Sequence, residues 1–356
     1  MQYDVMHFEA LGAESDHLKE LTEKAQKEGR LPKDLQYLIT PDDLQNYMKK
    51  HPELQLPDII TTKTHSILPT EYLKGTKKSV ITRSAGYDHF EALSNVINLT
   101  SLRNYCVNAV AQTAMKFLYA TAGMLNEYTQ NTCTFERNKS TSFIELGKSK
   151  VATVFGVGKI GKRTYELLEA NGMTVQGVDL RYKELDEQYN HTVKFVSKEE
   201  AIKNSDIIIN TMNLTKNKES KLYNVGYFSE EYLSQALKKL IIINVTRGEI
   251  APEAGLLNLY KQGKVLGIGL DVFTNEALFS ECLNGNEKFN TEDNIAAKTI
   301  LDSAINRSAN FYVQPHQGFN SDVAAIEKAK DAIEHLCEWY KNDKKKFDEQ
   351  LPYYEI

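Results

Sequence analysis

Short apolar runs alternate with helix-like segments over the second half of the chain. Residues 151–155, 206–210 and 240–245 are almost continuously apolar, which is typical of strands buried on both faces. Apolar residues recur at helical spacing between these runs. Further strands are predicted over 174–179 and 265–273, and helices over 198–204, 229–237 and 252–262. Residues 309–313 form a run that is mostly apolar. This alternation predicts a parallel sheet covered by helices on both faces.

A second α/β pattern precedes this region. Residues 58–62 (DIITT) and 79–83 (SVITR) are candidate strands, and no glycine-rich phosphate loop accompanies them. Residues 104–123 form a long, mostly apolar helix candidate that is rich in small residues, and a polar segment follows over 124–148. A last helix is predicted over 322–340. Because 356 residues exceed one typical core, we expect two domains.

Composition narrows the class of protein. Charged residues make up 26% of the chain and hydrophobic residues 41%, an ordinary globular balance. The formal net charge of −5 argues against a nucleic-acid partner, which needs clustered Lys and Arg. No signal-peptide pattern opens the chain, and no run of about 18 apolar residues exists to span a membrane. The 4 cysteines form no CxxC pair, so we expect reduced thiols, no metal site and a cytoplasmic location.

The segment Gly156-Val157-Gly158-Lys159-Ile160-Gly161 is a GxGxxG motif in the setting that dinucleotide binding requires. It follows an apolar run, opens a predicted helix and precedes a strand that ends at Asp179. The first glycine permits a tight turn, the second a close approach of the pyrophosphate, and the third close packing of helix on strand. The helix N-terminus, at Lys159 and Ile160, supplies free N–H groups and partial positive charge.

Asp179 favours NAD over NADP, because its carboxylate can accept hydrogen bonds from ribose hydroxyls and would repel a 2′-phosphate. Arg181, two residues later, would favour NADP instead, because an Arg can bind the 2′-phosphate. A ligand-free glycine turn and a methyltransferase loop for S-adenosylmethionine are the alternatives to a dinucleotide site. The strand, the helix and Asp179 together favour the dinucleotide.

Two segments with charged or polar residues end predicted strands, namely NVTRG at 244–248 and GLDVFTNE at 269–276, and a third, QPHQGF at 314–319, follows the mostly apolar run 309–313. Open α/β sheets bind ligands past the carboxyl ends of their strands. With the glycine motif, and in this order, these segments resemble the D-isomer-specific 2-hydroxyacid dehydrogenase family, in particular its D-lactate dehydrogenase-like branch. The resemblance covers roughly residues 75–340.

The resemblance implies a Rossmann-type doubly wound NAD domain over 104–315. This domain would be inserted into a smaller, flavodoxin-like α/β substrate domain formed by 1–103 and 316–356. It also implies a homodimer and a small 2-keto or 2-hydroxy acid as substrate. The family's enzymes reduce such an acid to the D-2-hydroxy acid by hydride transfer.

By similarity, Arg247, Glu276 and His316 are the catalytic residues. A guanidinium can bind the carboxylate of a 2-keto acid and polarise its carbonyl. An imidazolium can protonate the carbonyl oxygen as the hydride arrives, and a carboxylate on its other nitrogen fixes the tautomer. Thr246 and Asp271 are expected cofactor contacts, although Asp271 also fits a buried residue that caps a turn. Taken singly, the Arg, Glu and His would be a surface ion pair, a loop carboxylate and one of eight histidines.

The substrate end is predicted from four residues. Ala85 and Gly86 resemble the family's turn whose N–H groups meet the substrate carboxylate, although a plain strand-ending turn would look the same. Tyr105 and Phe319 match the lactate-type branch, or else pack in the core.

Some positions depart from the family, including the 110–113 segment of the long helix and an insertion over 277–308. Lactate-type members of the family have a Tyr near the position of Thr62 that narrows the substrate pocket, and this chain has none there. The resemblance therefore also allows substrates larger than pyruvate. An NAD(H)-sensing binding protein of the same fold is the second functional hypothesis.

Overall fold

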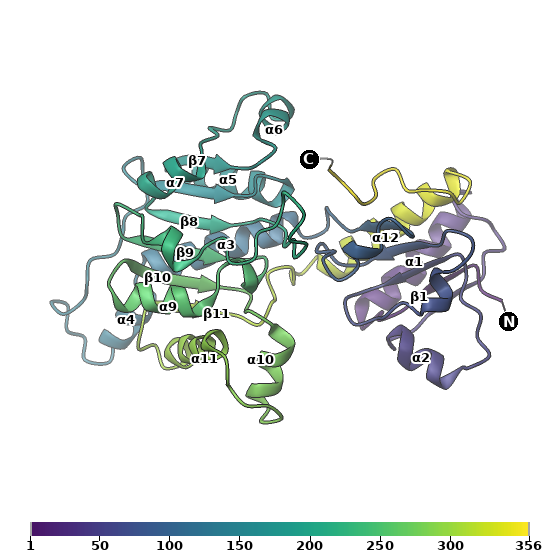
Figure 1. Cartoon of the computed structure of the whole chain (residues 1–356), viewed down its shortest axis with the longest axis horizontal. Helices are drawn as coiled ribbons and strands as arrows, with labels where there is room; N and C mark the ends of the chain where they lie inside the picture. Colours follow the sequence, from purple (N-terminus) through teal and green to yellow (C-terminus); the bar gives the residue numbers. More distant parts are fainter. Residues whose placement is uncertain (1, 355–356) are drawn as a thin grey trace. The chain divides into compact units, whose positions relative to one another are not determined.

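In the computed structural model, which describes residues 2–354, the chain divides into two compact units. Unit 2 is Val107–Phe319, and unit 1 is built from the residues up to Cys106 and from Asn320 onwards. His316 and Phe319 therefore lie in unit 2, and the chain returns to unit 1 directly after Phe319. Each unit contains one parallel sheet with helices packed on it (Figure 1). No helix within residues 2–354 is long and apolar enough to cross a membrane.

Unit 1 contains a five-stranded parallel sheet in the order β2-β1-β3-β4-β5. Its elements are β1 (Val5–His7), α1 (Ala13–Lys27), β2 (Tyr37–Ile39), α2 (Leu44–Lys50), β3 (Ile59–Thr62), η1 (Thr70–Leu73), β4 (Ser79–Thr82), η2 (Glu91–Leu93), β5 (Asn98–Ser101) and α12 (Ala324–Lys341). Successive strand residues face opposite sides, so Val5 and Ile81 pack with α1 and α12 while Met6 and Val80 pack with α2. The strand order reverses between β1 and β3, which makes the carboxyl ends of these strands a topological switch point.

Unit 2 contains a six-stranded parallel sheet in the order β11-β10-β9-β8-β6-β7. Its elements are α3 (Val107–Ala122), α4 (Leu125–Asn131), β6 (Val151–Phe155), α5 (Lys159–Ala170), β7 (Thr174–Val178), α6 (Tyr182–Gln188), α7 (Lys198–Asn204), β8 (Ile207–Asn210), α8 (Glu230–Leu233), β9 (Leu240–Asn244), η3 (Gly248–Ile250), α9 (Glu253–Lys261), β10 (Val265–Leu270), α10 (Glu276–Leu283), α11 (Glu292–Ile305) and β11 (Phe311–Val313). Its order reverses between β6 and β8, which places the loop after β6 at a second switch point.

Several predicted elements are shorter than expected. The strand predicted over 265–273 ends at Leu270, because its ladder partner β9 ends at Asn244. The helix predicted over 229–237 has only four residues, Glu230–Leu233. The predicted insertion, 277–308, holds most of α10 and all of α11, and α11 buries Ala297 and Ile300 in the core of unit 2. At least this part of the segment therefore covers the sheet.

Candidate active site

The glycine loop after β6 is shaped to receive a phosphate. Gly156 has a φ of +85°, a left-handed conformation that favours glycine. A Cβ on Gly161 would lie 2.0 Å from the Gly156 carbonyl oxygen, so α5 approaches the loop as closely as it does only because residue 161 has no side chain. Gly158 caps α5 without a side-chain hydrogen bond, and a Cβ there would meet nothing within 4 Å. The first N–H groups of α5 are therefore open to an anion.

Asp179 follows β7 and closes the loop from the other side. Its Oδ2 accepts the Val157 N–H at 2.8 Å, and its Oδ1 accepts the Arg181 N–H at 2.8 Å. An ionised carboxylate has about four acceptor positions, so about two remain for ribose hydroxyls. The guanidinium of Arg181 pairs with Glu184 at 3.3 Å, which directs positive charge toward a protein carboxylate. The loop, the helix end and Asp179 fit the adenosine diphosphate half of NAD.

The three expected catalytic residues follow three neighbouring strands of unit 2. Arg247 follows β9, Glu276 follows β10 and His316 follows β11. Because these strands are parallel, all three residues lie past the same edge of the sheet. His316 Nδ1 lies 2.8 Å from Glu276 Oε2. The side chains of His316 and Glu276 are 36% and 40% exposed. An ionised carboxylate only accepts hydrogen bonds, so Nδ1 carries the hydrogen and Nε2 is the nitrogen that can exchange a proton.

Two buried asparagines hold the turn that carries Arg247. Asn210 ends β8, and its side chain donates to Asn244 Oδ1 and to Thr246 Oγ1, both at 2.9 Å. Asn244 ends β9, and its Nδ2 donates to the Arg247 carbonyl at 2.9 Å. Sequence analysis did not single out these residues. A usable signal was present, since the tetrapeptide Ile-Ile-Ile-Asn occurs at the end of both strands.

Asp271 anchors the segment that carries His316. It is only 1% exposed. Its Oδ1 accepts from the Gln314 side chain at 2.6 Å and the Gln317 N–H at 2.7 Å, and its Oδ2 accepts the Gly318 N–H at 2.9 Å. The role of Asp271 as a turn-holding carboxylate, considered as an alternative from the sequence, is therefore visible in the geometry. One acceptor position of its carboxylate is still left for a cofactor amide.

A second acidic residue, Glu253, holds the turn before Glu276. Glu253 is 1% exposed, and its Oε1 accepts the Thr274 N–H at 2.8 Å. Burial raises the pKa of the Glu253 carboxyl to about 7. Glu276 contributes to the same turn, because its Oε1 accepts the Phe273 N–H at 3.3 Å. Sequence analysis missed Glu253, since a glutamate in the first turn of a helix is usually a solvated residue.

Of the four expected substrate residues, only Phe319 belongs to unit 2, and its ring centroid lies 6.4 Å from that of His316. Ala85, Gly86 and Tyr105 belong to unit 1. Ala85 and Gly86 form a half-buried turn after β4, where Ser84 Oγ donates to the Gly86 carbonyl at 2.7 Å. Tyr105 packs against the core of α1 and α12.

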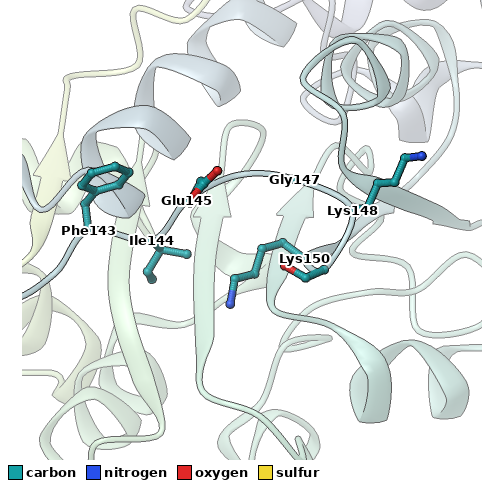
Figure 2. Close-up of a pocket in the computed structure, with 7 residues that line it drawn as sticks. Phe143, Ile144, Glu145, Gly147, Lys148 and Lys150 are labelled. Atoms are coloured by element: carbon teal, nitrogen blue, oxygen red, sulfur yellow. The ribbon is translucent and has the colours of Figure 1, made fainter.

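A pocket along 143–150 lies away from these residues. It is lined by Phe143, Ile144, Glu145, Gly147, Lys148, Ser149 and Lys150 (Figure 2). This segment leads into the amino end of β6, whereas the glycine loop leaves the carboxyl end of that strand. The two ends are about 16 Å apart for a five-residue strand, so the pocket contributes nothing to the candidate site.

Comparison with known proteins identifies the family to which the chain is similar. The family model named "D-isomer specific 2-hydroxyacid dehydrogenase, NAD binding domain" matches residues 114–318. A D-lactate dehydrogenase from Staphylococcus aureus (strain Mu50 / ATCC 700699) is 25% identical over 253 residues, which is 69% of this chain and 71% of the relative. A glyoxylate reductase from Thermococcus gammatolerans is 28% identical over 209 residues, 56% of this chain and 60% of the relative.

Among solved structures, the D-lactate dehydrogenase from Aquifex aeolicus, complexed with NAD and lactic acid, aligns with a TM-score of 0.74 at 22% identity. The alignment covers 99% of this chain and 100% of that one. The matched range 114–318 contains the glycine loop and the strand ends that carry Arg247, Glu276 and His316. These findings confirm the predicted α/β fold class and NAD as the cofactor.

Proposed function

The chain belongs to the D-isomer specific 2-hydroxyacid dehydrogenase family, and we propose that it reduces a small 2-keto acid to the D-2-hydroxy acid with His316 as the acid. The observation that carries this proposal is the 2.8 Å pair between His316 Nδ1 and Glu276 Oε2, past the same edge of the sheet as Arg247 and the glycine loop. The D-lactate dehydrogenases among the relatives suggest a pyruvate-like acid as the first substrate to test.

Each residue has a defined role in this proposal. NADH, when bound, supplies the hydride. Arg247 binds the carboxylate of the acid and polarises its carbonyl through a fork of N–H donors. His316 donates the Nε2 proton to the carbonyl oxygen as negative charge develops there. Glu276 keeps the proton on Nδ1 and fixes the ring, and in the reverse direction His316 acts as the base.

The remaining expected residues bind the two ligands. Gly156, Gly158 and Gly161, with the Lys159–Ile160 end of α5, cradle the pyrophosphate, and Asp179 binds the ribose. Thr246 and the remaining acceptor position of Asp271 contact the nicotinamide half. The N–H groups of Ala85 and Gly86 bind the substrate carboxylate, and Tyr105 and Phe319 border the substrate. Unit 2 is then the NAD domain and unit 1 the substrate domain, and the protein assembles as a homodimer, which light scattering would test.

The proposal is tested by NADH oxidation at 340 nm with pyruvate, 2-ketobutyrate, 2-ketoisocaproate, phenylpyruvate and glyoxylate. His316→Ala should lower kcat by about 10²–10⁴-fold, the usual contribution of a general acid. His191→Ala is the matched control, because His191 also pairs with a carboxylate, Asp186, at 2.7 Å but in an exposed position. Tight NADH binding without turnover of any acid would refute the enzyme and favour an NAD(H) sensor of the same fold.

A further inference from the structure

Buried charges gather past the carboxyl edge of the unit 1 sheet, at the switch point between β1 and β3. Lys63 follows β3, Arg83 follows β4, and Glu14 lies in the first turn of α1. Lys63 Nζ lies 2.5 Å from Glu14 Oε2, and Arg83 Nε donates to Glu14 Oε1 at 2.9 Å. Arg83 is fully buried and also donates to Thr61 Oγ1 and to the Phe8 carbonyl. The carboxyl edge at a switch point is where open α/β sheets bind ligands.

Positive charge exceeds negative charge in this cluster. Lys328 of α12 is 8% exposed and adds a third cation. Its pKa falls to about 8, because burial and the charges of Lys63 and Arg83 disfavour the ammonium form although Glu14 favours it. A second buried carboxylate, Glu9, accepts N–H and O–H hydrogen bonds from the loop after β3. Three cations against two carboxylates leave one net positive charge, which one bound anion would neutralise.

Lys63 and His7 have hydrogen-bonding capacity left for such an anion. The Lys63 ammonium has three hydrogens, gives one to Glu14, and is 21% exposed. His7 is fully buried, and its Nδ1 lies 2.9 Å from Thr61 Oγ1. Thr61 Oγ1 also accepts from Arg83, and when the Thr61 hydroxyl donates its hydrogen to His7 Nδ1 the ring carries its own hydrogen on Nε2. His7 Nε2 is buried and has no hydrogen-bond partner within the part of the chain that the structure describes.

We propose that this cluster is a subsite for a second anionic group on the substrate, so that the preferred substrate is a 2-keto acid with a carboxylate or phosphate at its far end. The inference rests on the proposed function and names its substrate class. The register pairs Thr62 with Thr82, so Lys63 and Arg83 leave neighbouring strands, whose spacing is about 4.8 Å. Arg83 leads directly into the Ala85–Gly86 turn that is expected to hold the 2-carboxylate. The two anionic groups of a short substrate would then bind at the carboxyl ends of two neighbouring strands of unit 1.

The test compares acids that differ in one anionic group. 2-Ketoglutarate and 2-ketovalerate have the same number of carbons, and phosphohydroxypyruvate is compared with hydroxypyruvate to distinguish a phosphate from a carboxylate. We expect kcat/KM for at least one acid with two anionic groups to exceed that of its partner by about tenfold, the effect of one good charge-assisted contact. Lys63→Met should remove about that factor from the ratio, and Lys63→Arg should restore most of it.

Lys78→Met is the matched control, because Lys78 also pairs with a carboxylate, Asp58, and has a similar exposed fraction of 20%, but precedes β4 at the opposite end of the sheet. Salt gives a readout that needs no variant, and KM for the dianion should rise between about 0.05 and 0.5 M NaCl while KM for the monoanion changes less. Equal kcat/KM for both members of each pair, together with the same effect of Lys63→Met and Lys78→Met, would overturn the subsite and leave the proposed function intact. No turnover of any 2-keto acid would overturn both.

Discussion

Replacing Asp271 with Asn should displace the segment that carries His316, although the two side chains have nearly the same shape. The Asp271 carboxylate accepts three hydrogen bonds, from Gln314, Gln317 and Gly318, at 2.6 to 2.9 Å. An amide has only one acceptor oxygen, and its NH₂ group would face at least one of these donors. Because the donors lie on both sides of His316 in the chain, loss of either end frees the histidine backbone.

The expected effect is large for a change of one atom. Loss of a hydrogen bond to a charged acceptor costs about 1.5–3 kcal/mol, and leaving a buried N–H opposite another donor adds about 1–3 kcal/mol. The free energy of unfolding of unit 2 should therefore fall by about 3–5 kcal/mol and its thermal midpoint by about 10 °C. A shift of His316 by about 1 Å would lower kcat about a hundredfold. Differential scanning fluorimetry and NADH oxidation measure the two effects.

Gly318→Ala tests the same anchor without changing the carboxylate that is expected to contact nicotinamide. A Cβ at residue 318 would lie 2.5 Å from Asp271 Oδ2, so the segment must move. Asp302→Asn is the control, because Asp302 forms a partly exposed ion pair with Lys298, and such pairs contribute at most about 1 kcal/mol. Two results together would refute Asp271 as the anchor of the His316 segment. The thermal midpoint of Asp271→Asn would lie within about 2 °C of that of the parent chain, and Gly318→Ala would retain the parent kcat.

Three further changes test other parts of the site. Folded chains keep the Glu253 proton up to about pH 7, whereas unfolded chains release it above about pH 4.5, so the free energy of unfolding should fall by about 3–4 kcal/mol as the pH rises between these values. Glu253→Gln should flatten that slope in denaturant titrations, and an unchanged slope would assign it to another group. Gly161→Ala, whose Cβ would lie 2.0 Å from the Gly156 carbonyl oxygen, should weaken NADH binding at least about tenfold in fluorescence titrations. Asp179→Ala should lower the ratio of the rate with NADH to the rate with NADPH. An unchanged ratio would exclude Asp179 as the cause of the preference for NADH.

The parts of the fold that follow from local pattern were predictable. The apolar run 151–155 coincides with β6, and the predicted helix 198–204 coincides with α7, because both signals lie within a few neighbouring residues. The glycine loop was equally readable, since its conformational demands fall on Gly156 and Gly161 themselves. The strand predicted over 265–273 was too long, because its end is set by a partner strand far away in the sequence.

The supporting contacts of the site were not predictable in the same way. Asp271 meets Gly318, 47 residues later, and Asn210 meets Asn244, 34 residues later. Nothing in the local sequence around a buried polar residue states which distant donor it will satisfy, because that depends on the strand order. The charge cluster around Glu14 and Arg83 was missed for this reason as well, since its members lie on different elements of unit 1.

The conformation of His316 explains why its neighbours are so fully engaged. Its φ of +51° is left-handed, which is unfavourable for a residue with a Cβ and is maintained only where surrounding contacts over-determine it. The His316 N–H donates to the Asp271 carbonyl at 2.7 Å, while the Asp271 side chain holds the residues on either side. One residue at the end of β10 therefore fixes both the backbone of the histidine and its flanks. The imidazole needs only Glu276 to complete its orientation, and a ring held in this way loses little further freedom when substrate binds.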